Sequence, residues 1–306
     1  LLIDGIKVED PQTGHHTLNM ALPLEVIERV EIIKGPAARV FGQNAFTGAI
    51  NIVTKSDADS VNSVGYKLGS YDQQQASGTI GTNLENTSLI GHASVNTSEG
   101  YRYNTDFENQ NYFVKGRFNT NGNPIEVIGS FSERKFGANQ FYAVQSGHDQ
   151  YEETQSSLVG ASTKFQTENF KITPRIYWKR NQDMYLYVRE RPSVYRNLHI
   201  SNKVGLQINT SYTSNAGITG FGIDVAKVFM TSTNLGERDR TMANLFVEHR
   251  FSLADNALDI TPGVSVNYFS DFKFHAFPGV DFGYAINDAF KAYANVGYTY
   301  RVPTYT

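Results

Sequence analysis

Apolar and polar side chains alternate along most of the chain after residue 55. In residues 170–179, for example, Phe, Ile, Pro, Ile and Trp alternate with Lys, Thr, Arg, Tyr and Lys, and residues 203–212, 258–268 and 290–300 follow the same pattern. Successive side chains of a β-strand point to opposite faces of the sheet, so this period predicts strands with one apolar and one polar face. Each segment is roughly ten residues long, as is a tilted strand that crosses a bilayer.

The connections between these segments alternate in length. Every second connection is short and contains Asn, Asp or Gly, which tolerate tight turn geometry. These turns cover residues 83–86, 121–124, 167–169, 215–217, 254–256 and 287–288. The intervening connections are mostly longer, with loops predicted at residues 98–109, 134–155, 181–200 and 231–240. A soluble β-sandwich has no reason to sort its loops in this way, whereas an outer-membrane β-barrel has short turns on one side of the membrane and long loops on the other.

Residues 22–55 have a different pattern. Apolar side chains recur at helical spacing over residues 24–30, after Pro23, which predicts a short helix. Residues 30–33 and 50–53 are rich in Ile and Val and predict two short strands. Turn residues separate the strands, and those expected to carry the turns are Gly35, Pro36, Gly42 and Gly48. This part of the chain is therefore predicted to be a small α+β unit.

The sequence of this unit resembles a known family. Residues 28–55, ERVEIIKGPAARVFGQNAFTGAINIVTK, resemble the end of the plug domain of TonB-dependent outer-membrane receptors. The resemblance rests on the ERVE start, the KGP turn, the Phe41-Gly42 pair and the GAINIVTK ending; the family usually has tyrosine where Phe41 stands. Residues 1–6, LLIDGI, resemble an earlier plug strand, and residues 301–304, RVPT, resemble a stretch inside family barrels.

The resemblance implies a mainly β fold, namely a transmembrane antiparallel β-barrel of roughly 22 strands with an α+β plug domain in its lumen. Residues 1–55 are then predicted to be the C-terminal part of the plug, and residues 56–306 the first about thirteen strands of the barrel. Further parts of the plug and barrel are expected outside this sequence, which is taken to be a fragment.

The resemblance also implies a function, the active import of a scarce, bulky solute across the bacterial outer membrane. The implied partners are outer-membrane lipid, an extracellular small-molecule ligand, and the TonB protein of the inner-membrane energising complex, which would bind a segment outside this sequence. A surface-exposed lipoprotein is a further partner that the resemblance allows. Two residues, Arg29 and Glu31, are expected to pair with charged residues of the barrel wall and so to act as a plug–barrel lock. Ordinary solvation of a surface strand is the alternative for both.

Composition is compatible with this interpretation. The chain has 306 residues, a net charge of −3 and no cysteine, and aromatic residues make up 13%. Its mean hydropathy of −0.38 would suit a soluble protein, but the lumen and lipid faces of a barrel average to such a value. The net negative charge argues against a nucleic-acid partner. A large soluble β-sandwich remains the simpler alternative on composition alone.

Candidate chemistry is sparse, and no enzyme, cofactor or metal site is predicted. His15 and His16 are adjacent, so on an extended chain their side chains point apart. Asp106 and Glu108 could hold calcium, although no EF-hand spacing supports this. No nucleotide-binding or hydrolase motif occurs. A passive porin or adhesin barrel would explain the strands but not residues 22–55, and an outer-membrane enzyme lacks a persuasive catalytic set.

Aromatic residues of the long loops are the candidate ligand-binding residues: Tyr101, Tyr103, Phe136, Phe141, Tyr142, Tyr185 and Tyr187. They suit a collar around a large, partly apolar ligand, with packing inside the loops as the alternative. Residues 135–142 and 149–154 resemble cobalamin-receptor-like members of the family, of Bacteroidetes type. Cobalamin or a related corrinoid is therefore the first expectation. A ferric siderophore is the second, because Arg180, Arg189, Arg191 and Arg196 make the fourth loop basic.

Overall fold

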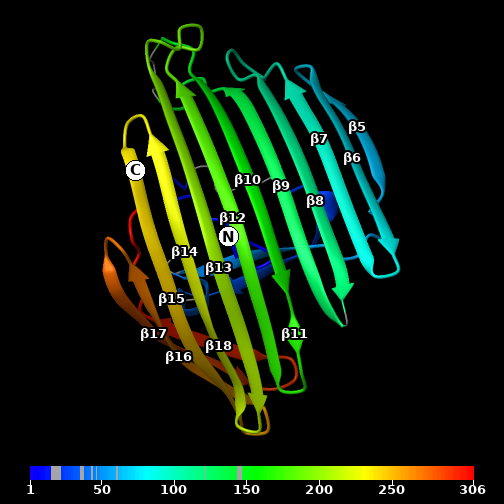
Figure 1. Cartoon of the computed structure of the whole chain (residues 1–306), viewed down its shortest axis with the longest axis vertical. Helices are drawn as coiled ribbons and strands as arrows, with labels where there is room; N and C mark the ends of the chain where they lie inside the picture. Colours follow the sequence, from blue (N-terminus) through cyan, green and yellow to red (C-terminus); the bar gives the residue numbers. More distant parts are fainter. Residues whose placement is uncertain are drawn as a thin grey trace.

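The computed structural model describes residues 1–14, 22–34, 38–42, 44–45, 47–59, 61–120, 122–142 and 147–306. The described chain forms a small four-stranded sheet and a large 14-stranded antiparallel sheet. The large sheet curves, and the small sheet lies behind it in the view of Figure 1. The small sheet thus lies against one face of a wall built by the strands of residues 63–297.

The small sheet has the strand order β2-β1-β4-β3. Its strands are β1 (Leu2–Ile3), β2 (Ile6–Lys7), β3 (Ile27–Lys34) and β4 (Gly48–Thr54). Strand β1 pairs in parallel with β4, and the other pairs are antiparallel. A tight turn at Asp4 and Gly5 joins β1 to β2. The Asp4 carboxylate accepts hydrogen bonds from the backbone N–H and the hydroxyl of Thr54, which fastens this turn to the end of β4.

The helix predicted over residues 24–30 is wrong. Only a single 3-10 turn, η1 (Leu24–Val26), forms there, and β3 begins at Ile27. Leu24 and Val30 are exposed, so the helical spacing has no core to face, while pairing with β4 satisfies the backbone of β3. The expected turn glycines Gly42 and Gly48 both have positive φ, +84° and +151°, and a four-residue helix α1 (Ala38–Phe41) precedes the first. Gly35 and Pro36 lie outside the described residues.

The large sheet confirms the mainly β, antiparallel prediction, because its strands follow one another in chain order. A two-residue strand, β11, pairs only with β12. The strands are β5 (Ser63–Gly69), β6 (Gln73–Leu84), β7 (Thr87–Ser98), β8 (Phe107–Thr120), β9 (Asn123–Gly137), β10 (Tyr151–Thr163), β11 (Phe165–Gln166), β12 (Phe170–Leu186), β13 (Arg196–Ser214), β14 (Gly217–Ser232), β15 (Gly236–Leu253), β16 (Leu258–Phe269), β17 (Lys273–Ala285) and β18 (Lys291–Gly297).

One end of the wall carries short turns and the other carries the long loops at residues 99–106, 138–150 and 187–195, which we call the mouth loops. The loop predicted at residues 231–240 is wrong, since β14 and β15 pair up to Ser232 and Gly236. The Ser232 hydroxyl accepts hydrogen bonds from the backbone N–H groups of Asn234 and Leu235 and so closes a tight turn. The strands beside the mouth loops also extend farther than their alternation indicates.

The two faces of the wall differ as the alternation predicts. Val264 is 37% exposed on the outer face, whereas its neighbour Ser265 is 0% exposed on the inner face. The apolar core lies between the inner face and residues 3–26, where Ile3, Ile6 and Val8 pack with wall residues that include Phe113. Gly160 of β10 permits this contact, because a Cβ there would lie 2.4 Å from the Ile6 Cδ1 atom. None of the helices in the described residues is long and apolar enough to cross a membrane.

Candidate functional site

Charged groups on the inner face of the wall hold residues 4–10. The ammonium group of Lys115, on β8, lies 3.2 Å from the Asp4 carboxylate and 2.9 Å from the Thr54 hydroxyl. It also lies 3.3 Å from Glu126 of β9. Lys115 is only 3% exposed, and a lysine buried to that extent needs such partners. This cation therefore joins the first turn of the small sheet, the end of β4 and the wall at one point.

A second contact surrounds Glu9. Lys179 and Lys203 lie directly opposite each other on β12 and β13 and are both buried. Lys203 donates to the Glu9 carboxylate at 2.9 Å, and Lys179 donates to the Glu9 backbone carbonyl at 3.1 Å. Two like charges in opposite positions of a sheet repel each other, so Glu9 supplies the anion that this part of the wall requires. Partial burial would raise the pKa of Glu9, but Lys203 and Lys7 outweigh this effect and hold its pKa at about 2.

Two further cations of the plug form ion pairs with the wall. Lys7 lies 2.5 Å from Asp224 of β14. Arg39 of α1 is buried and pairs with Asp281 of β17, with Glu248 of β15 at 3.6 Å. The charged wall residues that contact the plug thus come from strands β8, β12, β13, β14, β15 and β17, so the attachment spans most of the width of the sheet.

The two residues predicted as a lock lie elsewhere on the small sheet. The Arg29 guanidinium pairs with Glu31 at 2.8 Å and with Glu28 at 2.6 Å, all on β3. Glu31 also accepts a hydrogen bond from the Asn51 side chain of β4. These side chains are about half exposed and have no wall partner within the described part of the chain. The wall residues that do contact the plug, such as Lys115 and Lys203, occupy polar positions of the strand alternation. That pattern indicates which face of the sheet they lie on, but it does not indicate their partners.

The mouth loops bring some of the predicted aromatic residues together. Tyr142 contacts Phe141 and Tyr185, with ring centroids 4.7 and 5.0 Å apart, and Tyr195 extends this group. Burial and the neighbouring Glu152 carboxylate raise the pKa of Tyr142, so its hydroxyl stays protonated and can donate a hydrogen bond. Tyr187 packs against His148 instead.

The other predicted aromatic residues stand apart from this group. Tyr101 and Tyr103 are exposed on the first mouth loop, and Tyr101 lies beneath the Arg102 guanidinium. Phe136 is a strand residue of β9 and pairs with Phe107 and Glu152. The structure therefore supports one aromatic cluster rather than a continuous collar.

Arg189, one of the four arginines of the loop predicted to be basic, joins the three mouth loops. Its guanidinium binds both carboxylate oxygens of Asp106 at 2.7 and 2.8 Å and lies 4.7 Å from the centre of the Tyr151 ring. Its backbone N–H donates to the Asp149 carbonyl, while the Asp149 carboxylate accepts from the Tyr103 hydroxyl at 2.5 Å. The Arg189 hydrogen bonds lower the pKa of Asp106. Asp106 is therefore engaged by an arginine, and the described residues contain no group of three side chains that could hold a metal ion. His15 and His16 lie outside them.

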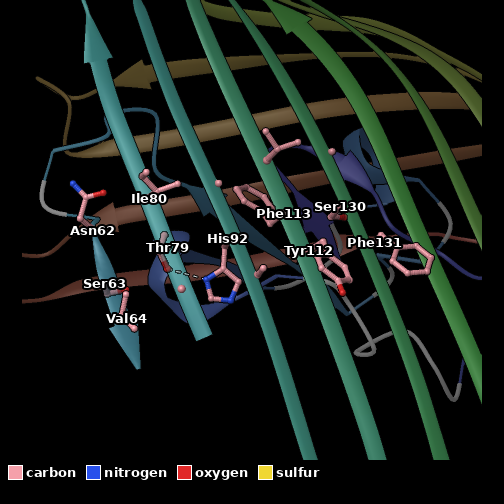
Figure 2. A pocket seen from close by; sticks show the side chains of 15 residues that line it. Asn62, Ser63, Val64, Thr79, Ile80, His92, Tyr112, Phe113, Ser130 and Phe131 are labelled. Carbon is pink, nitrogen blue, oxygen red and sulfur yellow. Dashed lines mark hydrogen bonds between the residues drawn. The ribbon is translucent and has the colours of Figure 1, made fainter. Parts of the chain in front are cut away.

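The outer face carries an apolar hollow across β5 to β9, with a volume of about 1090 Å³. Gly78, Gly91 and Gly129 leave it open, and Ile80, Val114 and other large side chains border it. Figure 2 shows this region and, within it, the hydrogen bond between the Thr79 hydroxyl and the His92 ring, 2.8 Å long. Both of these polar groups are buried, so the surface that remains is apolar.

Comparisons with known proteins agree with this architecture. The family model described as TonB dependent receptor-like, beta-barrel, matches residues 47–306, and the TonB-dependent receptor plug domain matches residues 1–49. The chain belongs to the TonB-dependent receptors. In the terms of this family, the small sheet is part of the plug, the large sheet is part of the barrel wall, and the outer face is the lipid-facing side of an outer-membrane barrel.

Relatives with differently named roles resemble this receptor. It is 26% identical over 239 residues to the vitamin B12 transporter BtuB of Vibrio vulnificus, covering 74% of this chain and 38% of that protein. It is 28% identical over 140 residues to the iron-regulated outer membrane virulence protein of Vibrio cholerae, covering 44% of this chain and 17% of that protein.

Solved structures share the fold. The siderophore receptor PirA from Pseudomonas aeruginosa superimposes with a TM-score of 0.79 at 16% identity, over 99% of this chain and 54% of that one. The FrpB iron transporter from Neisseria meningitidis superimposes with a TM-score of 0.74 at 12% identity, over 91% and 54%. The receptor chain thus spans less than two thirds of the length of each of these relatives.

Proposed function

We propose that this chain is part of a transporter that imports a scarce, bulky solute across the outer membrane, with energy delivered through TonB. The observation that carries this proposal is the attachment of the plug to the wall through buried ion pairs at Lys115 and Lys203. Breaking a buried pair without replacing its partner costs about 3–5 kcal/mol, so such a plug does not leave the wall spontaneously. A passive porin has no use for a blocked lumen, whereas an energised transporter does.

The proposed substrate is cobalamin or a related corrinoid, bound at the mouth loops. The support is the resemblance of residues 135–142 and 149–154 to cobalamin-receptor-like proteins, together with the BtuB relative, which is named a vitamin B12 transporter. A ferric siderophore is the second candidate, supported by the four arginines of the fourth loop and by the fold shared with PirA, which is named a siderophore receptor. The proposed contacts are Phe141, Tyr142 and Tyr185 of the aromatic cluster, with Tyr101, Tyr103, Phe136 and Tyr187 around it.

Binding and uptake by the full-length receptor test this proposal. We expect saturable binding of cyanocobalamin at micromolar concentration, and uptake into cells that a protonophore abolishes. Uptake that is insensitive to the protonophore would contradict energised transport. Absence of cyanocobalamin binding, together with induction of the protein by iron starvation, would assign the mouth to a siderophore instead.

The lock proposed for Arg29 and Glu31 has a separate test. Their exposed pair at the surface of β3 is expected to contribute little to stability, about 0–1 kcal/mol. If the pair guides plug movement, reversal of either charge should reduce uptake more than it reduces surface binding of cyanocobalamin. Unchanged uptake in both Arg29→Glu and Glu31→Lys would return the pair to simple solvation.

A further inference from the structure

A polar cavity lies between the plug and the wall at the turn end, far from the mouth loops. Its volume is about 670 Å³, and it is bordered by the plug turn at Asp4 and Gly5 and by the turn ends of β8, β9, β10, β11 and β12. These strand ends lie at the lower edge of the wall in Figure 1. The volume falls within the range of sites that hold small molecules.

More basic than acidic residues border the cavity. Its three acidic residues are already engaged: Asp4 and Glu126 by Lys115, and Glu31 by Arg29. Five basic residues also border it. Arg29 and Arg117 lie beside Glu31 and Glu126, whereas Lys164, Lys171 and Arg175 of the wall form no ion pair within the described ranges. The cavity therefore has an excess of cationic groups that the chain does not neutralise.

Arg175 is held in place for binding. A Cβ atom at Gly5 would lie 2.9 Å from the Arg175 Cζ atom, so the guanidinium rests directly on the Gly5 backbone. Its Nε donates to the Asp4 carbonyl at 3.1 Å. Gly5 itself has φ +80°, a conformation that favours glycine. A guanidinium fixed in this way loses little freedom when it binds an anion. Ser162 and Thr173, which lie on the same face of the sheet as Arg175, border the same space and carry hydroxyl groups as further donors.

We propose that this cavity is a binding site for a phosphate- or carboxylate-bearing small molecule at the turn end of the barrel, with Lys164, Lys171 and Arg175 as its cationic contacts. The site does not depend on the transport function proposed for the mouth, because it is defined by the plug and the wall alone. Phosphate groups occur both on free solutes and on lipid headgroups, and the experiment below separates these two sources.

The test measures binding of inorganic pyrophosphate to the purified full-length receptor in phospholipid-free detergent by isothermal titration. Lys171 is exposed, so Lys171→Glu should fold, and we expect it to weaken binding by about tenfold or more. Lys273→Glu, at the opposite end of the wall, makes the same charge change and should leave the affinity within about twofold. Lys164→Glu serves as a second variant inside the cavity.

Each outcome decides the proposal. Equal pyrophosphate affinity in the unaltered receptor, Lys171→Glu and Lys273→Glu would overturn it, as would absence of binding. A parallel titration with micelles that contain phosphatidylglycerol distinguishes the source: binding of the lipid that Lys171→Glu weakens, without binding of pyrophosphate, would assign the cavity to a headgroup and overturn the small-molecule site. Cyanocobalamin uptake is not a readout here, so failure of the transport proposal would leave this result intact.

Discussion

The inner and outer faces of the same strands carry side chains of opposite polarity, because they face different surroundings. On β16, Val264 faces outward and Ser265 inward, yet the serine is the more buried of the two. On β14, Ile223 faces outward and is exposed, while its neighbour Asp224 faces inward and pairs with Lys7 of the plug. The wall thus places its polar side chains where the plug covers them and its apolar side chains where lipid would cover them. The comparison teaches that an exposed side chain on the outer face contacts lipid and not water, so its exposure there does not oppose an apolar side chain.

The largest effect is expected from a substitution on the inner face of the wall. Lys115→Met leaves Asp4 and Glu126 without their buried cation and should lower the free energy of unfolding by about 3–5 kcal/mol. Urea unfolding of the full-length receptor in detergent measures this. The matched control is Lys227→Met on the outer face, whose pair with Asp239 is exposed and should be worth less than about 1 kcal/mol. Equal losses of unfolding free energy in the two variants would show that burial by the plug does not determine how much an ion pair contributes to stability.

The next effect tests the outer face. Val264→Arg places a charge in the apolar band and should cost about 2–4 kcal/mol near the bilayer midplane. Leu253→Arg, at the turn end of β15, also faces outward but lies at the end of its strand, so it should cost about 0–1 kcal/mol. Folding titrations into lipid vesicles compare the two. If both substitutions cost the same, the depth assignment of β15 and β16 is wrong. Ser265→Arg is no neutral control, since that serine is fully buried on the inner face.

A pH titration tests how much the Glu9 carboxylate contributes to the contact between the plug and the inner face. Its pKa falls from 4.5 to about 2 in the folded receptor, because Lys203 and Lys7 outweigh the effect of burial. The stability that this carboxylate contributes is therefore complete above pH 4.5 and is lost as the pH falls toward about 2. Protease susceptibility of residues 8–14, followed from pH 6 downward, should rise only near the lower value. In Glu9→Gln, the protease susceptibility of these residues should no longer depend on pH in this range. An unchanged pH profile in that variant would show that another group causes the rise.

The smallest effect concerns the exposed mouth loops. Arg189→Met removes the bidentate contact with Asp106 and the contact with the Tyr151 ring, which should loosen the three mouth loops by about 1 kcal/mol. Hydrogen exchange at the amides of Gly137 and Asn139 measures the loosening. Arg191→Met, in the same loop, is the control because Arg191 forms no ion pair in the described chain. The contact should also weaken in the unaltered receptor as the pH falls through the lowered pKa of Asp106.

The sequence by itself determined the local features of this receptor. Alternation fixed which face of each strand is apolar, as Val264 and Ser265 illustrate, because a strand has a period of two whatever its surroundings. The turn residues marked the short connections, and the segment from Glu28 to Lys55 identified the plug. The exact ends of the strands were not determined, since the alternation fades where both faces of a strand meet water, and β12 runs on to Leu186.

Only the tertiary structure decided which charges meet. Lys115 and Asp4 are separated by 111 residues and Lys203 and Glu9 by 194, and the strength of each pair depends on burial between the plug and the sheet. The sequence singled out Arg29 and Glu31, but their pair lies exposed on β3. A sequence shows which residues are charged, but it does not show the burial that determines how strongly they interact. The same holds for Arg189, whose partners come from two other loops and from β10. Partner choice is a property of the folded wall and plug together, and no period along the chain encodes it.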